Sequence, residues 1–383
     1  MFHYSKITLG NTPRPLRFSP LFLLLFTRIF VLLCVLSVLL CASVANVFAD
    51  EPPTAGEGRV DLATDKGLQF LAASQLPDGS WPVTGYGGSS GISSVAVLAF
   101  MAKGHMPGQG PYGTTIERGI RYVLAQSQSN GLIQAPSAKS TPMYNHGMST
   151  LMLSQALGMC EESLAAQIRP VLTRAIKLTL QAQAATKKDP LHIGGWRYNP
   201  NSDDSDISCT GWQLLSLRAA KDCGADVPKA AIDAAVDYIK RSKSPDGGFS
   251  YQAGTSVAAH AASNRARAGT GIVSLEICSR HQEPEALTAA TFLIEHPPIL
   301  NQNNELAFYY AAYYTSQAMF QVGGRYWEIE RPRMEALLLS IQQPNGSWPS
   351  ADSSDQPAGP AYCTSMAILS LAVKYHYLPI YQR

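Results

Sequence analysis

Two kinds of helical pattern alternate along this chain of 383 residues. Segments such as 116–124 and 231–240 carry charges on one face and apolar residues at spacings of three and four, which is typical of a helix at a water boundary. Segments such as 93–100 and 364–371 are apolar almost all round, which predicts helices buried on every side. The alternation therefore predicts helical hairpins, each with one half-exposed helix and one buried helix.

A glycine turn joins the two helices of each hairpin. In segments 76–81, 244–249 and 343–348, Pro-Asp-Gly or Pro-Asn-Gly is followed two residues later by Trp or Phe. With weaker copies, the turn glycines fall at 79, 131, 195, 247 and 346, and the last, doubled gap leaves room for a degraded copy around residues 301–304. Six such units predict an all-α, closed (α/α)6 toroid of six helical hairpins with the buried helices inside; an open helical solenoid is the alternative.

The first 49 residues differ in composition from the rest. Four basic residues precede the apolar run 29–40, no acidic residue occurs before Asp50, and small residues stand three and one positions before Asp50. This pattern predicts a signal peptide in residues 1–49 and an exported, single toroid domain in residues 50–383, in the periplasm, cell envelope or extracellular space. A retained membrane anchor is the alternative, because the run is close to the ~17-residue lower limit for spanning a bilayer.

Charge and cysteine content narrow the function classes. The chain has 30 basic and 28 acidic residues, and without the four basic residues of the leader 26 stand against 28. A nearly neutral domain does not favour nucleic-acid binding. Five cysteines follow the leader without CxxC or Cys–His spacing, so we expect no metal site and no cofactor, while one internal disulfide stays open.

Candidate chemistry lies where the inner helices begin, because exposed N–H groups and helix dipoles meet at that rim. The units align on a column of Ser94, Thr150, Thr210, Thr270, Thr315 and Thr364. Four residues before this column, His146 in the second unit and Asp206 in the third occupy equivalent positions, and Asp204 precedes Asp206. The sequence thus predicts an acid/base pair at the barrel mouth; helix capping by Asp206 and a structurally bonded His146 is the alternative.

Aromatic and basic residues near the same rim are candidate ligand contacts. Such rings stabilise a carbocation, hold an isoprenoid or stack on a sugar, and plain packing between helices is the alternative. Arg265 is a candidate contact for an anionic group. The predicted contacts are Tyr144, Trp196, Trp212, Arg265, Tyr309, Tyr313, Tyr314 and Tyr362.

One turn carries a resemblance to a known family. The spacing from Gly67 to Trp81, Gly-x3-Leu-x3-Gln-x3-Gly-x-Trp, resembles the QW repeat of squalene-hopene cyclases, shared in looser form by protein prenyltransferase β subunits. Over roughly residues 60–380 the resemblance implies the α/α toroid of the terpenoid cyclase superfamily. It also implies that Asp206 matches the proton-donating Asp of the cyclases, although Ile207 replaces the acid that follows it. In the prenyltransferase zinc site Asp206 matches the Asp, but Ser208 replaces the Cys, so no zinc is expected.

These observations predict an exported squalene cyclase-like protein of the prenyltransferase-repeat type that binds an apolar isoprenoid or lipid ligand in the barrel mouth. If the protein is catalytic, the resemblance implies a terpene cyclase-like isomerase or lyase with Asp206 as general acid. The alternative is a non-catalytic toroid that binds a glycan or a partner protein in the cell envelope. Peripheral contact with a membrane and the oligomeric state stay open.

Overall fold

The computed structural model describes residues 55–138, 141–255, 262–300 and 307–382. Within these ranges the chain has twelve α-helices and no strand beyond three isolated bridges, so the all-α class is confirmed. Residues 58–383 pack as one compact unit. The predicted leader 1–49 and the degraded turn at 301–304 lie outside the described residues.

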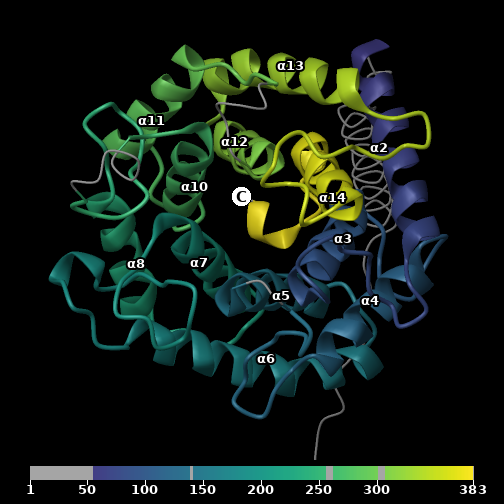
Figure 1. The fold of residues 1–383 in the computed structure, drawn as a ribbon, viewed down its shortest axis with the longest axis horizontal. Coiled ribbons are helices and arrows are strands. Elements are labelled where there is room, and N and C mark those ends of the chain that lie inside the picture. Colours follow the sequence, from purple (N-terminus) through teal and green to yellow (C-terminus); the bar gives the residue numbers. More distant parts are fainter. Residues whose placement is uncertain (1–54, 139–140, 256–261, 301–306, 383) are drawn as a thin grey trace, which may run out of the picture. The chain divides into compact units, whose positions relative to one another are not determined.

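Six of the described helices form an inner ring, whose arrangement can be followed in Figure 1. Each packs against the next one in chain order, and the last packs against the first, so the ring closes and the open solenoid is excluded. Every residue of the first inner helix is buried, as the apolar pattern predicted. The inner helices are α3 (Ser90–Ala102), α5 (Pro142–Leu157), α7 (Ile207–Asp222), α10 (Arg265–Glu276), α12 (Phe308–Val322) and α14 (Pro360–Leu371).

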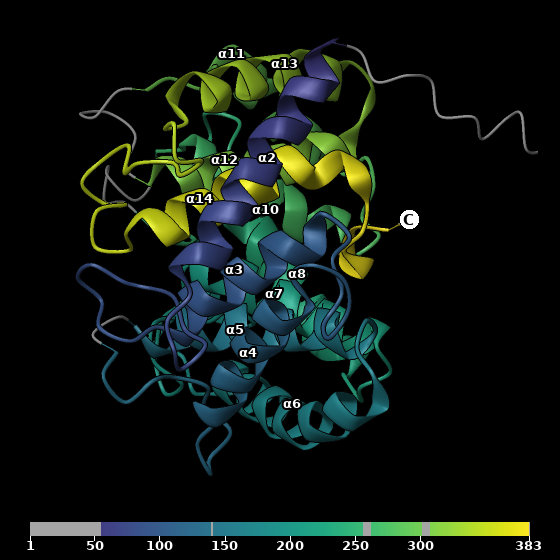
Figure 2. The ribbon, with the colours of Figure 1, turned by 90° about the vertical axis from the view of Figure 1, so that its right-hand side faces the viewer.

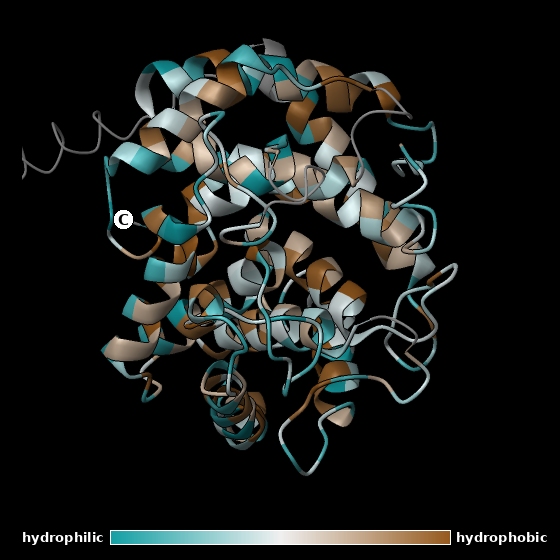
Figure 3. Cartoon of the chain, turned by 60° about the vertical axis from the view of Figure 1, so that its left-hand side comes forward, coloured by the Kyte–Doolittle hydropathy of each residue, from teal (hydrophilic) through white to brown (hydrophobic). Residues whose placement is uncertain are grey.

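Six further helices surround this ring. They are α2 (Ala55–Ser74), α4 (Gly113–Ala125), α6 (Glu162–Gln183), α8 (Lys229–Arg241), α11 (Pro284–Glu295) and α13 (Gly324–Ile341). Each buries one face only: in α4, Ile116, Ile120 and Val123 are buried, whereas Arg121 is exposed. The side view shows α2 on the outside of the inner helices (Figure 2), and hydrophilic and hydrophobic positions alternate along the outer helices (Figure 3). No helix in the described ranges is long and apolar enough to cross a bilayer.

The turns after the outer helices tie neighbouring units together. In the first unit, the Gln75 side-chain amide donates to the carbonyl oxygens of Gly79 (3.0 Å) and of Thr115 (2.9 Å) in the next outer helix. The Trp81 indole N–H donates to the Leu71 carbonyl at 2.8 Å, which anchors the ring between outer and inner helix. Gln183 and Gln342 repeat the amide pattern, and Trp348 repeats the indole bond.

The turn glycines lie where backbone approaches backbone. Gly346 has a φ of +87°, and a Cβ on it would stand 2.3 Å from the Lys66 carbonyl oxygen of α2. This contact closes the outer ring between the last and first units. In the third unit the equivalent residue is Gly194, with a φ of +89°, and the assignment of this turn to Gly195 was wrong. Gly194 stands two residues before Trp196, as Gly79 stands two residues before Trp81, whereas Gly195 is adjacent to the tryptophan.

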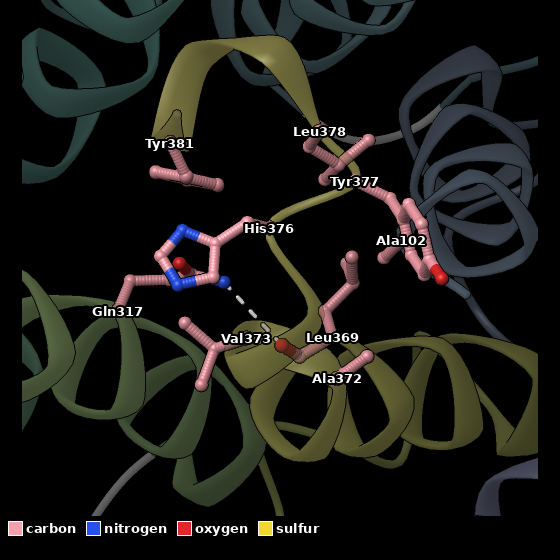
Figure 4. Close-up of a pocket in the computed structure, with 9 residues that line it drawn as sticks. All are labelled: Ala102, Gln317, Leu369, Ala372, Val373, His376, Tyr377, Leu378 and Tyr381. Carbon is pink, nitrogen blue, oxygen red and sulfur yellow. Dashed lines mark hydrogen bonds between the residues drawn. The ribbon is translucent and has the colours of Figure 1, made fainter. Parts of the chain in front are cut away.

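The C-terminal segment occupies the end of the ring opposite the inner-helix N-termini. After α14, η2 (Ala372–Tyr375) leads to η3 (Pro379–Tyr381), which Figure 1 shows inside the ring. The Ile380 amide donates to the Gln155 side chain of α5 at 3.1 Å, and the Tyr381 hydroxyl lies 2.6 Å from that of Tyr313 in α12. A void of about 10 Å³ lies beside this segment, room for about one water molecule (Figure 4).

The cysteines of the described ranges are not cross-linked. Cys160, Cys209, Cys223, Cys278 and Cys363 are all free thiols. Two of them, Cys209 and Cys363, are buried in inner helices, where a thiol packs as a small apolar group. None of the five forms the internal disulfide that the sequence left open.

Candidate functional site

A cavity of about 630 Å³ opens at the rim where the inner helices begin. Residues at the start of all six inner helices contribute to its wall, and so do the loops that precede α3, α7 and α10. Its volume lies within the range of about 300–1,000 Å³ that is usual for small-molecule sites. The tyrosines that line it are Tyr86, Tyr144, Tyr198, Tyr251, Tyr310 and Tyr362.

Two of the predicted ligand contacts, Tyr144 and Tyr362, lie in this wall. The Tyr144 ring stands 6.2 Å from the Tyr198 ring, and the Tyr198 hydroxyl is hydrogen-bonded to that of Tyr251. Sequence reasoning missed Tyr86 and Tyr251, because they lie in loops outside the helical repeat and no spacing connects them. The one signal they share with Tyr198 is a tyrosine in the loop before an inner helix, which recurs before α3, α7 and α10.

Three other predicted contacts fill the barrel interior instead of lining the cavity. Trp212 stacks on Tyr313 with ring centroids 5.6 Å apart and planes 6° apart, and it meets the Tyr314 ring edge-on at 5.4 Å. All three side chains are buried. Tyr310 links this stack to the cavity, because it lines the cavity and its ring lies 4.7 Å from that of Tyr314.

Trp196, Tyr309 and Arg265 have structural positions. The Trp196 indole donates to the Thr179 carbonyl at 2.8 Å, the same anchoring bond as in the other turns. The Tyr309 hydroxyl donates to the Pro349 carbonyl at 2.7 Å. Arg265 is buried between helices, where it pairs with Glu330 of α13 and donates to the Leu293 carbonyl at 3.0 Å, so it does not face the cavity.

Asp206 caps α7 and is enclosed by protein. Its Oδ1 accepts from the Cys209 amide at 2.8 Å, its Oδ2 lies 2.7 Å from Nη1 of Arg197, and the residue is 0% exposed. Arg197 also pairs with Asp204 at 3.2 Å and donates to the Tyr251 hydroxyl at 2.8 Å. Burial raises the pKa of the Asp206 carboxyl, although the Cys209 amide and the Arg197 guanidinium oppose this shift.

Asp206 is not among the residues that line the cavity. Arg197 bonds to both the Asp206 carboxyl and the Tyr251 hydroxyl, and of these three residues Tyr251 lines the cavity, so a ligand there would meet the tyrosine before the carboxyl. The same capping geometry recurs at Ser89, whose Oγ accepts from the Ile92 amide, and at Asn264. The arrangement is therefore the helix-capping alternative that the sequence left open for Asp206.

His146 does not reach the mouth, and the expected pair with Asp206 is not formed. Its Nδ1 accepts from the Ile133 amide at 3.2 Å, and its Nε2 lies 3.0 Å from the Thr179 hydroxyl of α6. Burial lowers the pKa of His146 to about 4, so the ring is neutral at pH 7.

The error lies in the alignment of the second unit. In the third and sixth units, the amides of Trp196 and Trp348 donate to Thr210 and Thr364 at 3.0 Å. The Ile133 amide makes the corresponding bond to His146. His146 is thus equivalent to these threonines and lies one helical turn deeper than Asp206, facing the outer helix.

Charged groups stand on two sides of the cavity. Arg267, in the first turn of α10, lines the cavity, and its guanidinium lies 5.2 Å from the centre of the Tyr251 ring. Asp355 lines it in the loop before α14, where it is 1% exposed. Asp355 could not be predicted from the repeat, because the loop that carries it matches no repeated position. Within the described ranges, no cluster of three or more His, Cys, Asp or Glu side chains is arranged to hold a metal ion.

Neither a protein-family model nor a curated protein sequence matches this chain. A variant of the type II terpene cyclase MstE from Scytonema, bound to geranylgeranyl dihydroxybenzoate, superposes with a TM-score of 0.51 at 11% identity, covering 84% of this chain and 98% of the cyclase. An inactive variant of the α-1,6-mannanase GH76A of Salegentibacter sp. HEL1_6, bound to α-1,6-mannotriose, gives a TM-score of 0.59 at 11% identity over 82% and 98%. A glycosidase in complex with glucose gives 0.57 at 12% identity over 84% and 98%. The chain therefore has the α/α-toroid fold that terpene cyclases and glycosidases share.

Proposed function

We propose that this protein binds an amphiphilic small molecule, with an isoprenoid or lipid body, in the mouth of the toroid. The observation that carries the proposal is the wall of six tyrosines around one cavity of about 630 Å³. Their rings offer apolar area to a hydrocarbon chain, and a phenol hydroxyl is a polar group that can also bond to a polar head. Ile92 and Met148 add apolar side chains to the wall.

Two further observations support an apolar body. The Trp212–Tyr313–Tyr314 stack fills the barrel below the cavity, so the ligand rests on aromatic rings linked to Tyr310. The structurally similar terpene cyclase MstE binds geranylgeranyl dihydroxybenzoate, a molecule with a polyprenyl chain and a polar head. The proposal assigns no chemistry to Asp206, since that carboxyl caps a helix and is paired with Arg197.

A glycan is the second candidate ligand. Tyrosine rings also stack on sugar faces, and hydrophilic side chains such as Asn145, Asn264 and Arg267 stand among them. The similar mannanase binds α-1,6-mannotriose. We place this candidate second because the one carboxylate among the described lining residues is Asp355, whereas hydrolysis of a glycoside uses two carboxyl groups that flank the bond.

Binding of geranylgeraniol and of mannotriose, followed by tryptophan fluorescence and calorimetry, tests the proposal. We expect geranylgeraniol to bind and Tyr144→Ala or Tyr362→Ala to weaken it roughly tenfold, because each removes a ring worth about 1–2 kcal/mol of contact. Tyr377→Ala is the matched control, since Tyr377 is half-exposed on the C-terminal segment at the other end of the ring. Binding of mannotriose alone would favour the second candidate, and binding of neither molecule would refute the site.

We further propose that the protein is exported and loses residues 1–49, on the strength of the leader pattern. Mature protein isolated from the native host should then begin at or near Asp50. Amino-terminal sequencing that finds the leader retained would instead support a membrane anchor.

A further inference from the structure

Asp355 is a buried carboxyl with an unused oxygen at the edge of the cavity. The residue is 1% exposed and lines the cavity wall, yet its Oδ2 has no hydrogen-bond partner among the described residues. None of the ion pairs in the described ranges involves it. A buried carboxylate without a counter-charge is costly. The structure therefore leaves a need for a positive or donating group at this point.

The neighbouring acid, Asp352, does not share this role. Its Oδ2 accepts from the Phe308 amide at 2.7 Å, which caps α12, and its Oδ1 accepts from the Ser354 amide at 2.7 Å. Both of its oxygens are thus used to shape the loop. The Gly85 amide donates to the Pro357 carbonyl at 2.8 Å, which holds the loop of Tyr86 against the loop of Asp355.

The six helix N-termini around the rim do not turn this side into an anion site. Side chains already accept from first-turn amides of four inner helices: Ser89 for α3, Asp206 for α7, Asn264 for α10 and Asp352 for α12. The remaining two, α5 and α14, begin with proline, which has no amide hydrogen. Among the described lining residues, Arg267 is the one with a positively charged side chain, and it lies beside Tyr251 of the fourth unit.

We propose that Asp355, Tyr86 and Tyr362 form a subsite for the substituted ammonium head of an amphiphilic ligand. This subsite rests on the proposed function and adds that the cavity selects a ligand with a positively charged head group. A carboxylate supplies the counter-charge, and tyrosine rings attract alkylammonium groups through their negative faces. The apolar body of the ligand would then lie on Tyr310 and Met148, which line the same cavity.

The charge of Asp355 responds to pH near neutrality. Burial, and then the charge of Asp352, raise the pKa of Asp355 to about 7, against the backbone amides of Ala351 and Tyr309, which lower it. Asp352 is the charged neighbour, whereas the phenols of Tyr86, Tyr309 and Tyr362 and the thiol of Cys363 are uncharged at this pH, because burial raises their pKa values above the ordinary range. A cation binds the ionised carboxyl, so its affinity must increase as the pH rises through this range.

The experiment compares octyltrimethylammonium with 1-octanol and octanesulfonate, by calorimetry on the mature protein. At pH ~8 we expect the ammonium to bind roughly tenfold or more tightly than the other two, since charge pairing and cation–π contact add to an equal chain. Between pH ~8 and ~6 its affinity should fall about tenfold, in step with the ionised fraction of a carboxyl whose pKa is about 7.

Variants separate the subsite from the rest of the mouth. Asp355→Asn keeps the shape of the side chain and should abolish the preference for the ammonium, with 1-octanol binding unchanged. Asp233→Asn, on the exposed face of α8, is the matched control. Tyr86→Phe should retain the preference and Tyr86→Leu should weaken it, because the ring face is the contact. Thermal unfolding checks that each variant is folded, and Tyr86→Leu tests the subsite independently of the carboxyl.

Three results would overturn the proposal. They are equal binding of the ammonium and 1-octanol, a preference that survives in Asp355→Asn, and an affinity that rises as the pH falls. The last would show that the protonated carboxyl donates a hydrogen bond to a neutral ligand. Failure of every probe, geranylgeraniol included, would refute the proposed function itself, whereas binding of neutral chains without preference would refute the subsite alone.

Discussion

Replacement of Arg197 by Met should destabilise the fold, because it leaves a buried carboxylate without its counter-ion. Oδ2 of Asp206 lies 2.7 Å from the Arg197 guanidinium, and Asp206 is 0% exposed. The remaining bond to Asp206, from the Cys209 amide, satisfies one oxygen only. Methionine keeps most of the length of the side chain, so the change removes the charge and its hydrogen bonds with little loss of packing.

The expected magnitude follows from the contact. Two unit charges about 4 Å apart attract by about 4 kcal/mol at an effective dielectric constant of about 20. Loss of one partner of a buried pair costs typically about 3–5 kcal/mol. Because the Arg197 side chain is 17% exposed and solvent screens part of the interaction, we expect a loss of about 3 kcal/mol in the free energy of unfolding. Asp206→Asn should cost only about 1 kcal/mol, since Asn caps a helix nearly as well and Arg197 keeps its contact with Asp204.

The assay is urea unfolding, followed by circular dichroism and by tryptophan fluorescence, on a double-mutant cycle of the two residues. In the Arg197→Met background, Asp206→Asn should stabilise the protein, because it removes the unpaired charge. The deficit of Arg197→Met should also shrink at low pH. In this variant, the folded protein binds a proton on Asp206 more readily than the unfolded chain does, so the free energy of unfolding increases as the pH falls through the raised pKa of Asp206.

Two results would refute this reasoning. One is an Arg197→Met variant within about 1 kcal/mol of the wild type. The other is a cost of Asp206→Asn that is the same in both backgrounds, which would mean that the two side chains are not coupled.

Two further predictions concern the turns and the buried imidazole. Gly346→Ala should lower the free energy of unfolding by more than about 3 kcal/mol, because it adds a clash with the Lys66 carbonyl to the strain of a positive φ. Gly224 has a similar φ and open space around it, so Gly224→Ala should cost only about 1–2 kcal/mol. Equal melting temperatures of the two variants would contradict the clash. Burial lowers the pKa of His146 to about 4, so as the pH falls below about 6.5 the unfolded chain takes up a proton on this residue before the folded protein does. The free energy of unfolding of the wild type should therefore decrease by up to about 3 kcal/mol between pH ~7 and ~4. His146→Gln should lack this part of the pH slope, and parallel slopes in the two proteins would disprove the neutral, buried ring.

The ring architecture could be predicted from the sequence because it depends on a local pattern. A helix such as 93–100, apolar on every side, has to be enclosed, and six such helices at a regular spacing enclose one another. Closure itself depends on the match between the last turn and the first helix, at Gly346 and Lys66, which the repeat implies but does not specify.

The site was harder to predict, because it depends on rotation about each helix and on loops. An alignment error of four residues at His146 kept the position on the same helix face but moved it one turn deeper, away from the rim. Arg265 and Arg267 are two residues apart on α10, and only the second one faces the cavity. Asp355 lies in an irregular loop, so its burial follows from tertiary packing that no periodicity encodes.

The C-terminal segment has a kinetic consequence for the mouth. Pro379–Tyr381 packs inside the ring, and Tyr381 is hydrogen-bonded to Tyr313, which belongs to the aromatic stack. Because this segment and the stack fill the barrel below the cavity, a molecule in the cavity arrives and departs through the same opening at the rim. Anything that partly covers that opening slows arrival and departure by the same factor. It would lengthen the residence time of the ligand while leaving the dissociation constant unchanged, so a cover over the rim would be detected in rates and missed in equilibrium titrations.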